Sequence, residues 1–398
     1  MKLVVWSSYS FEDSYAEYHI MEERLKAYAA SGFDIILIQK SFHKGKKLPE
    51  SLKSYSKIKT VDIPFEQPEK LSFAKRYLSE IKYYSQSSKA IPKDTDAIFI
   101  QSSFAAWKAV RISKKKKLKV IYNVQDIFPN DAVITGKLSE SSPIYKVLRS
   151  FQRKAYMSSN RVVTISEDLK KTLQNETGGK KQIDVIYNWS YQNEPYRIAD
   201  KDNHFLKKHG INRKDCFRVV YAGNIGQMMD ADMLLSTAER LREYKDIKFF
   251  LIGGGSNEQY IRQQVEEEHL ENVALYPFQP IEYAPDNYCM ADVNINPVPK
   301  GVIYTCMPSK TATCLLSEKP TVVSLDLDSD MANRLQKVDQ WTVVAPGDDK
   351  AMAEAILQYY KDIDWRNGEE KRSRNAAQFL KELGPVENAY QYVDILKN

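Results

Sequence analysis

The stretch Arg218-Val-Val-Tyr-Ala-Gly-Asn-Ile-Gly226 runs from an apolar, strand-like segment into a glycine-containing turn and the start of an amphipathic helix. A second apolar run, Phe249-Phe-Leu-Ile-Gly-Gly-Gly255, follows that helix. This order predicts a βαβ unit with glycines at two strand exits, where bare backbone can approach a phosphate closely. Another αβ unit begins at residue 3, so the sequence predicts two nucleotide-type domains. Two such domains with a cleft between them indicate an enzyme that joins a nucleotide-linked group to a second substrate.

Composition restricts the class of protein. The chain has 398 residues, 43% of them hydrophobic and 28% charged, which is typical of a soluble protein with two ordinary domains. Its four cysteines include no C-x-x-C pair, and its five histidines show no H-x-x-x-H spacing, so we expect free thiols and no metal site. The opening Met-Lys-Leu-Val-Val-Trp resembles a buried strand, and no apolar run approaches the ~18 residues of a membrane span. We therefore expect a cytoplasmic protein.

Positive charge is unevenly distributed along the chain. The net charge is +6, and the run Lys114–Lys117 holds four successive lysines. Residues 71–93 interleave aromatic and basic side chains. Such a stretch can lie on an anionic membrane surface, or it can be a solvated helix face. No basic-aromatic motif of a nucleic-acid reader occurs, so no nucleic-acid partner is expected.

Strands alternate with helices in both halves of the sequence, which predicts parallel sheets covered on both faces. The last strand of the first half is expected at 185–188. A helix is expected at 309–317, where a serine can cap its first turn. One long terminal helix is expected at about 368–396.

The domain boundaries follow from this alternation. Residues 1–190 form the predicted N-terminal domain, and the polar stretch 190–203 is the predicted linker. A second domain spans 204–370. The remaining segment, 371–398, is predicted to be a helix that packs back on the first domain.

Six motifs in order carry a resemblance across essentially the whole chain. They are Tyr221–Gly226, Gly253–Gly255, Pro277–Pro280, Ala291–Pro297, Pro308–Thr311 and Glu318–Ser324. Together they resemble a family 4 glycosyltransferase of the GT-B fold, in the bacterial branch that extends surface polysaccharides and includes O-antigen fucosaminyltransferases. Gln125-Asp-Ile-Phe-Pro129 is similar to the Q-D-L-W-P signature of that branch. The resemblance implies an α/β protein with two Rossmann-like domains whose parallel sheets face across a cleft, the first binding an acceptor and the second a nucleotide-sugar.

The first glycine loop is a candidate phosphate site. Gly223 and Gly226 remove side chains where a strand turns into a helix, so the backbone N–H groups of Asn224, Ile225 and Gly226 can face a diphosphate. The alternative is a turn that merely needs positive φ.

The second glycine loop and a nearby aromatic residue are candidates for the nucleoside. Gly253 and Gly254 can admit a base or ribose beside the backbone, and a tight turn is again the alternative. Phe278 can pack on the nucleobase, or it can pack on its own domain.

The segment Pro308-Ser309-Lys310-Thr311 starts a predicted helix. A lysine in the first turn opposes the helix dipole, so Lys310 needs a reason to be there. A diphosphate supplies one, because ammonium and helix N-terminus would converge on the charge of the leaving group. The alternative is an ordinary exposed lysine.

Asp126 follows a strand exit, at the sheet edge where α/β proteins bind ligands. Its carboxylate can orient or deprotonate an acceptor hydroxyl. Asp131 is a nearby alternative for that role. Asp126 can also be only a turn residue before a proline.

The chain departs from the family at several donor contacts. Thr305 and Thr313 stand where the family usually carries two glutamates, and a threonine can bond ribose or sugar only as a neutral group. The basic pair common in the first loop of the second domain is missing at 224–229. The glycine-rich loop of the first domain is replaced by Ser7-Ser-Tyr-Ser-Phe11.

The resemblance implies a retaining, nucleotide-sugar-dependent hexosyl- or N-acetylhexosaminyltransferase that needs no metal or other cofactor. Its expected donor is a UDP-sugar, and its acceptor a lipid-linked saccharide in capsule, exopolysaccharide or O-antigen assembly. Such an enzyme would work in the cytoplasm, peripherally on the inner face of the membrane. The missing glutamates leave an alternative, a non-catalytic binding subunit that stabilises a partner transferase. A sugar-nucleotide 2-epimerase shares the architecture, but the cluster of acids and a histidine that it needs is not found in the sequence.

Overall fold

The computed structural model describes residues 1–7, 10–11, 15–42, 48–65, 73–116, 118–190, 192 and 194–398, with the backbone alone at 15–17, 73–77 and 115–116. The chain divides into two compact units. The first comprises Met1–Trp189, Thr305–Met307 and Pro385–Asn398, and the second comprises Ser190–Tyr304 and Pro308–Gly384.

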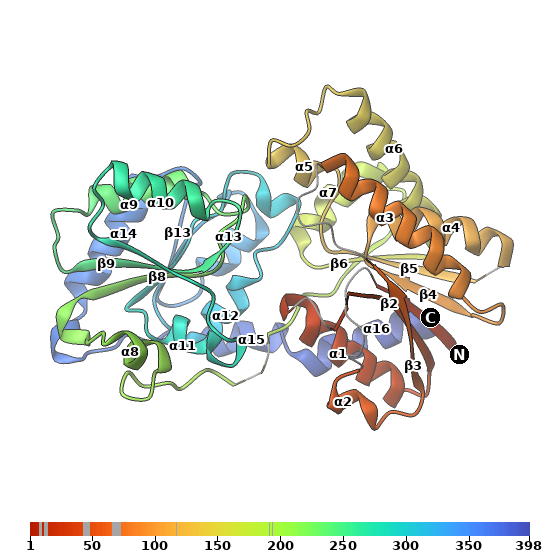
Figure 1. Cartoon of the computed structure of the whole chain (residues 1–398), viewed down its shortest axis with the longest axis horizontal. Coiled ribbons are helices and arrows are strands. Elements are labelled where there is room, and N and C mark those ends of the chain that lie inside the picture. Colours follow the sequence, from red (N-terminus) through yellow and green to blue (C-terminus); the bar gives the residue numbers. More distant parts are fainter. Residues whose placement is uncertain are drawn as a thin grey trace. The chain divides into compact units, whose positions relative to one another are not determined.

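The first unit is a parallel sheet of seven strands in the order β3-β2-β1-β4-β5-β6-β7. The strands are β1 (Lys2–Trp6), β2 (Asp34–Ser41), β3 (Ile58–Pro64), β4 (Ala97–Ile100), β5 (Lys119–Val124), β6 (Arg161–Thr164) and β7 (Ile183–Val185). The helices are α1 (Tyr15–Ala30), α2 (Glu50–Lys53), α3 (Phe73–Ser87), α4 (Ser103–Lys116), α5 (Asn130–Ile134), α6 (Pro143–Ser158), α7 (Glu167–Thr177) and α16 (Pro385–Lys397). Helices α1 and α16 pack together on one face, and α3, α4 and α6 cover the other (Figure 1).

The second unit is a parallel sheet of six strands in the order β10-β9-β8-β11-β12-β13. The strands are β8 (Phe217–Asn224), β9 (Ile247–Gly254), β10 (Val273–Tyr276), β11 (Val293–Asn296), β12 (Thr321–Ser324) and β13 (Trp341–Val344). The helices are α8 (His204–His209), α9 (Ala231–Arg240), α10 (Glu258–Glu267), α11 (Ala284–Cys289), α12 (Lys310–Ser317), α13 (Asp330–Leu335), α14 (Asp349–Asp362) and α15 (Ala376–Glu382). Figure 1 shows α9, α10 and α14 on one face of the sheet and α8, α11 and α12 on the other.

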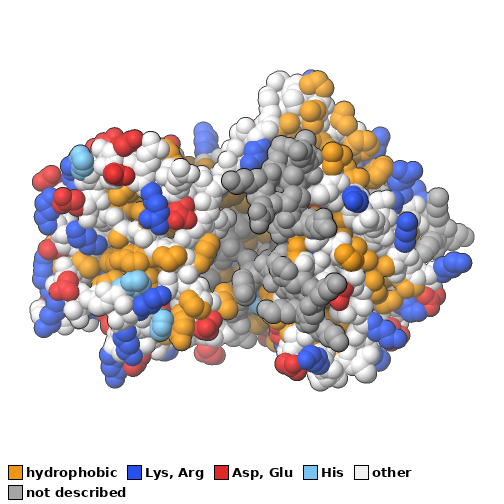
Figure 2. Space-filling model, viewed as in Figure 1, with side chains coloured by type: hydrophobic (Ala, Val, Ile, Leu, Met, Phe, Trp, Pro, Cys, Tyr) orange, Lys and Arg blue, Asp and Glu red, His pale blue; other side chains and the backbone are white. Residues whose placement is uncertain are grey.

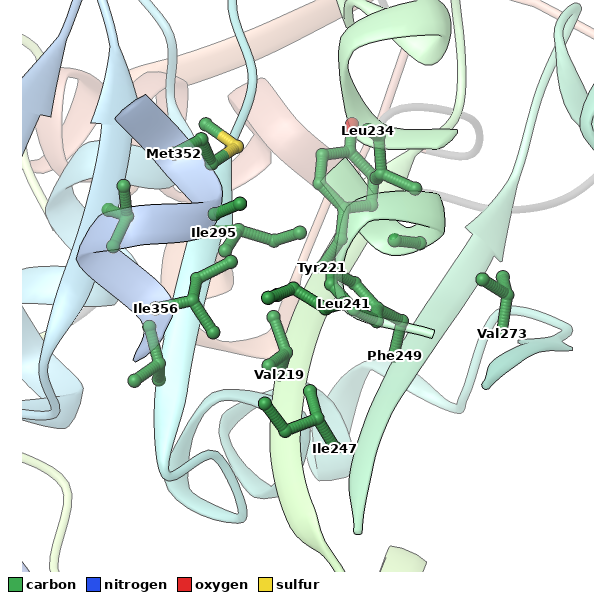
Figure 3. Close-up of a cluster of buried hydrophobic side chains, with 14 of the residues drawn as sticks. Val219, Tyr221, Leu234, Leu241, Ile247, Phe249, Val273, Ile295, Met352 and Ile356 are labelled. Atoms are coloured by element: carbon green, nitrogen blue, oxygen red, sulfur yellow. The ribbon is translucent and has the colours of Figure 1, made fainter. Parts of the chain in front are cut away.

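Strand alternation explains how the second core forms. Val219 and Tyr221 on β8 and Phe249 on β9 point to the same face, where Leu234 of α9 and Ile356 of α14 meet them (Figure 3). All five side chains are fully buried. Burial of each such side chain is worth roughly 1.5–3 kcal/mol, so this face fixes β8 firmly under the glycine loop.

The prediction of two Rossmann-like α/β domains with parallel sheets is confirmed. Two element predictions are wrong. The last strand of the first unit is Ile183–Val185 rather than 185–188. The terminal helix predicted at 368–396 is two helices, because Pro385 has no N–H to continue α15 and instead begins α16.

The structure divides the chain differently from the predicted boundaries. The predicted linker at 190–203 lies in the second unit, where the backbone N–H of Tyr196 donates to Leu316. Residues 371–384 also stay with that unit, so the return to the first unit begins at Pro385. There, Tyr392 of α16 donates a hydrogen bond to Asn123 of β5 at 3.2 Å.

Some sequence predictions fall outside the described residues: Ser8 and Tyr9 of the first loop, part of the stretch 71–93, and Lys117 of the lysine run. No disulfide joins the four cysteines, all of which are described. Within the described ranges no helix is both long and apolar enough to span a membrane. In the same ranges no three His, Cys, Asp or Glu side chains gather as metal ligands would.

Candidate functional site

The order of strands in the second sheet reverses between β8 and β11. Ligands of open α/β sheets bind outside the carboxyl ends of the strands at such a reversal. The glycine loop 223–226 leaves β8 at this point, so the predicted donor residues lie where the topology places a ligand.

Two glycines at the exit of β9 are required by close packing of backbone against backbone. Gly223 and Gly253 are register partners in β8 and β9. Gly253 has φ of +156°, and a Cβ on it would lie 1.8 Å from the carbonyl oxygen of Gly223. Gly255 is equally confined, because its Cβ would stand 2.4 Å from the carbonyl oxygen of Ile225. Neither position admits a side chain, whether or not a ligand is bound.

One predicted phosphate contact is wrong. The backbone N–H of Ile225 donates to the carbonyl of Gly254 at 2.9 Å, so it does not face a ligand. Asn257, at the start of α10, donates from its backbone to Ile225 at 3.0 Å and from its side chain to Gly226 at 3.1 Å. These bonds lock the loop 223–226 to the exit of β9, which makes it a rigid platform.

Lys310 lies on this platform, although 86 positions separate it from Gly223 in the sequence. A Cβ on Gly223 would stand 2.7 Å from Cε of Lys310 and 3.4 Å from its Nζ, so the glycine leaves room for the lysine stem. The ammonium lies over the Tyr221 ring, 4.8 Å from its centre. No carboxylate of the described residues pairs with it. The loop 223–226 contains no basic residue, and Lys310 of α12 places an ammonium group beside it.

Phe278 lies beside the second glycine loop. Its ring is 60% exposed, and its Cε2 atom is 3.3 Å from the position of a Cβ on Gly254. Oε2 of Glu258 on α10 lies 3.2 Å from the same Cβ position, and Glu258 pairs with Arg262 at 3.0 Å. An exposed aromatic face beside bare backbone is a suitable surface for a nucleobase.

The start of α12 differs in part from the prediction. Ser309 is exposed and its side chain accepts no hydrogen bond from the helix, so the predicted serine cap is wrong. Pro308 accepts instead, through its carbonyl, from the backbone of Thr311 at 3.2 Å. Thr311 is buried, whereas Thr313 is half-buried one turn after Lys310. Of the two threonines, Thr313 is the better placed to contact a donor.

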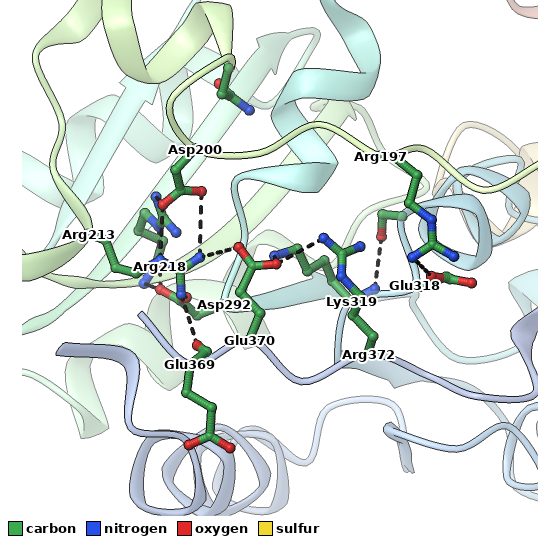
Figure 4. A network of polar contacts seen from close by, with 12 residues as sticks. Arg197, Asp200, Arg213, Arg218, Asp292, Glu318, Lys319, Glu369, Glu370 and Arg372 are labelled. Carbon is green, nitrogen blue, oxygen red and sulfur yellow. Dashed lines mark hydrogen bonds and ion pairs between the residues drawn. The ribbon is translucent and has the colours of Figure 1, made fainter. Parts of the chain in front are cut away.

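The opposite, amino edge of the second sheet holds a cluster of charges that pair with one another (Figure 4). Arg218 is fully buried, and its backbone N–H and Nε donate to Asp292 at 2.8 and 3.4 Å. Arg213 pairs with Asp292 at 2.8 Å and with Asp200 at 3.0 Å. Glu370 joins the cluster through Arg213 at 2.9 Å.

Ion pairing sets the pKa values in this cluster. Burial alone would raise the pKa of Asp200, but Arg218 and Arg213 bring it below its ordinary value. Burial likewise opposes ionisation of Glu370, yet Lys319 at 3.1 Å and Arg213 lower its pKa. The cluster fastens the chain around Asp200 and Glu370 to the sheet, and it has a structural role.

In the first unit, Asp126 lies two residues after the end of β5, and it is exposed. Its backbone forms an antiparallel bridge with Cys306, and the next amide, of Ile127, donates to Thr305 at 2.8 Å. Thr305 is therefore buried beside the Asp126 loop, as part of the first unit. Thr305 stands where the family usually carries a glutamate, and its backbone carbonyl helps to hold the loop that carries Asp126.

Asp131, the predicted alternative to Asp126, lies in α5. Burial raises its pKa to about 6, although a hydrogen bond from Ala132 at 2.7 Å and the charge of Lys137 oppose that rise. A carboxyl with such a pKa exchanges protons near neutral pH, as a general base must. The exposed Asp126 and the half-buried Asp131 therefore remain two chemically distinct candidates.

Sequence reasoning missed a pair of amides beside Asp126. Asn188 donates to Gln125 at 2.6 Å, which joins the end of β5 to the segment after β7. Gln125 belongs to a quoted motif, but the mistaken strand at 185–188 placed Asn188 in a sheet and concealed the contact. Tyr221 was also missed, since nothing in its motif shows that its ring supports Lys310.

Two family models match the sequence. Residues 20–189 match the model described as Glycosyltransferase Family 4, and residues 216–362 match Glycosyl transferases group 1. Together they cover most of both units.

Two curated bacterial proteins are similar to this chain. A probable glycosyltransferase of Pseudomonas aeruginosa, WbjE, is 21% identical over 60% of this chain and 59% of its own length. A putative colanic acid biosynthesis glycosyl transferase of Escherichia coli K12, WcaI, is 22% identical over 51% of this chain and 50% of its own. The chain thus aligns with between half and three fifths of these relatives.

Solved structures share the fold over the full chain. Sucrose-phosphate synthase from Thermosynechococcus elongatus has a TM-score of 0.78 at 13% identity, covering 100% of this chain and 98% of that one. Anabaena HepE, solved in complex with UDP, has a TM-score of 0.69 at 16% identity and covers 100% of both chains. At these identities the likeness concerns the fold alone.

Proposed function

Because this chain belongs to the glycosyltransferases of family 4, we propose that it transfers a sugar from a nucleotide diphosphate donor to a saccharide acceptor. We take the donor to be a UDP-sugar, and the reaction a hexosyl or N-acetylhexosaminyl transfer that retains anomeric configuration. The acceptor would be a lipid-linked saccharide of a surface polysaccharide. The name of WcaI supports the polysaccharide assignment, and the UDP complex of HepE supports the donor.

The single observation that carries the proposal is the position of Lys310. Lys310 is half-buried, pairs with no carboxylate among the residues that the structure describes, and lies against Gly223 at the strand-order reversal where such folds bind ligands. Diphosphate is the anion that a nucleotide-sugar would bring to this place. Charge that develops on the leaving group would then be stabilised by a group already in position.

The chemistry asked of these residues is limited. The bond between the anomeric carbon and the diphosphate oxygen breaks, and the electron pair leaves with the nucleoside diphosphate. The acceptor oxygen attacks the same face of the sugar and loses its proton. Lys310 would stabilise the departing diphosphate, while Asp126 or Asp131 would orient the acceptor hydroxyl. The prediction that the reaction needs no metal or other cofactor stays a prediction.

Donor binding and transfer can be tested separately. A panel of UDP-, GDP- and dTDP-sugars would be screened by thermal unfolding, since a ligand of the folded state raises its apparent stability. We expect a UDP-sugar to give the largest shift. Asp126→Asn should keep that shift and lose transfer by roughly 10²-fold or more if Asp126 is the general base. Asp131→Asn provides the matched comparison.

The results distinguish the proposal from its main alternative. If no nucleotide-sugar stabilises the protein, the donor assignment is wrong. If donors bind but no saccharide product forms with any acceptor, the chain is the non-catalytic binding subunit, which the threonines at 305 and 313 favour. Loss of transfer in Asp131→Asn alone would move the acceptor role from Asp126 to Asp131.

A further inference from the structure

Two neighbouring helices of the first unit carry basic residues and no acidic ones. The sequence of α4 contains five lysines and arginines, that of α6 contains four, and neither contains Asp or Glu. The helices pack side by side on the sheet. Lys146, Arg153 and Lys154 of α6 are exposed and form none of the ion pairs seen in the described chain. Arg149 alone on α6 pairs with an acid, Glu176, at 2.9 Å.

The same surface exposes apolar side chains. Ile144, Val147 and Phe151 of α6 recur at a spacing that places them on one stripe, and they are 61, 52 and 42% exposed. Trp107 of α4 is 42% exposed, and its ring meets Phe151 at 6.0 Å between centres. Arg111 lies over the Trp107 ring at 4.8 Å. Figure 2 shows hydrophobic side chains gathered over α6, with Lys and Arg among them.

We propose that this α4/α6 face docks on an anionic phospholipid bilayer. Apolar and aromatic side chains ringed by bases are the composition of surfaces that lie in the membrane interface. Lysines and arginines are attracted by acidic headgroups, while a tryptophan is suited to the boundary between headgroups and acyl chains. A second copy of the chain is disfavoured as the occupant, because pairing two such faces would oppose bases to bases.

The proposal changes the prediction made from the sequence. The stretch 71–93 contributes Leu78 and Ile81 of α3, which are 65 and 50% exposed beside α4. The larger share of the surface comes from α6, a helix whose sequence alone did not suggest it. The biological role of this surface rests on the proposed function, because a lipid-linked acceptor would itself lie in the bilayer. Lipid binding itself needs neither donor nor acceptor.

Trp107 provides the probe. It is the one exposed tryptophan of five, since Trp6, Trp189, Trp341 and Trp365 are all buried. The full chain would be mixed with vesicles of phosphatidylcholine, alone or with 30% phosphatidylglycerol, in the absence of nucleotide-sugars. We expect binding to the anionic vesicles, a blue shift of tryptophan emission, and quenching by brominated lipid. Trp107→Phe should abolish the spectral change.

Three variants test the surface. Replacing Lys146, Arg153 and Lys154 with Gln should weaken binding to anionic vesicles by on the order of 100-fold, at about fivefold per base. Replacing Ile144, Val147 and Phe151 with Ser should weaken binding at both low and high salt. The matched control replaces three exposed lysines of the second unit, Lys201, Lys245 and Lys361, with Gln and should bind like the unmodified chain.

Several outcomes would overturn the proposal. They are equal binding to neutral and anionic vesicles, an equal loss in the control, or unchanged Trp107 emission on binding. Self-association that the α6 substitutions abolish would assign the face to a second copy instead. Thermal unfolding of each variant separates these results from loss of the fold. Transfer to a short, water-soluble acceptor should be unaffected by the α6 substitutions, so failure here leaves the proposed function standing.

Discussion

The two edges of the second sheet treat charge in opposite ways. At the amino edge, Arg218 and Asp292 are buried, and Arg213 and Arg218 both pair with Asp292. At the carboxyl edge, Lys310 lies half-buried against Gly223 and pairs with no carboxylate of the described chain. A charge with its partners in place holds a structure together. A charge held in position without one is available for a ligand, so the contrast separates the structural residues from the candidate functional ones.

The largest effect on stability is expected from Asp292→Ala. The substitution leaves Arg213 and Arg218 without their most buried acceptor, and breaking such a pair costs about 3–5 kcal/mol. Urea unfolding followed by circular dichroism measures the loss. Glu239→Ala, at an exposed acid of α9, is the control and should cost less than about 0.5 kcal/mol. A small loss for Asp292→Ala would mean that the paired edge is not a structural anchor.

Gly253→Ala tests whether the glycine loops are fixed by backbone packing. A Cβ there would lie 1.8 Å from the Gly223 carbonyl, so the two strand exits must separate. We expect roughly 1–3 kcal/mol of destabilisation beyond that of Gly347→Ala, which has positive φ but open space around it. Chemical denaturation of both variants gives the difference. Equal losses would show that φ alone selects these glycines.

A smaller effect on stability is expected from Asp131 of the first unit, a carboxyl group whose charge the fold does not stabilise. Its pKa in the folded chain is about 6, above the ordinary value of 3.8, so ionisation is disfavoured by folding. Stability should therefore decline as pH rises from about 4 to 6, and the penalty should be fully present above that range. Asp131→Asn keeps the acceptor for Ala132 and should raise the unfolding free energy at pH 7, by roughly 1–3 kcal/mol, but not at pH 3. A gain that is equal at both pH values would exclude the shifted pKa as its cause.

Much of the fold follows from local pattern. Strand and helix periodicity predicts both parallel sheets, and it predicts the helix at 309–317 that is observed as α12, because burial of alternating side chains is a local property. The break at Gly384-Pro385 was overlooked even though proline marks it. The strand at 185–188 was misplaced because its apolar residues continue past the last bond of the ladder.

The site was predictable in its members but not in its contacts. The order of motifs identified Gly223, Gly253 and Lys310, whereas their packing depends on residues far apart in sequence. The pairing of β8 with β9 makes the backbone N–H of Ile225 donate to Gly254, and the approach of α12 places Lys310 over the Tyr221 ring. Neither contact can be read from the motifs. The charge cluster around Asp292 was missed for the same reason, since Asp200, Asp292 and Glu370 lie far apart in the sequence.

The most direct test of the unpaired lysine is calorimetric titration of UDP into the full chain and into Lys310→Ala. The account predicts that the variant binds UDP at least about tenfold more weakly, since hydrogen bonds to charged groups contribute about 1.5–3 kcal/mol. Its unfolding free energy should fall by no more than about 1 kcal/mol, since the variant loses the contact with the Tyr221 ring but deprives no described carboxylate of a partner. Lys361→Ala, at an exposed lysine of α14, is the control. Unchanged UDP affinity in Lys310→Ala would contradict the assignment of the carboxyl edge as the donor site.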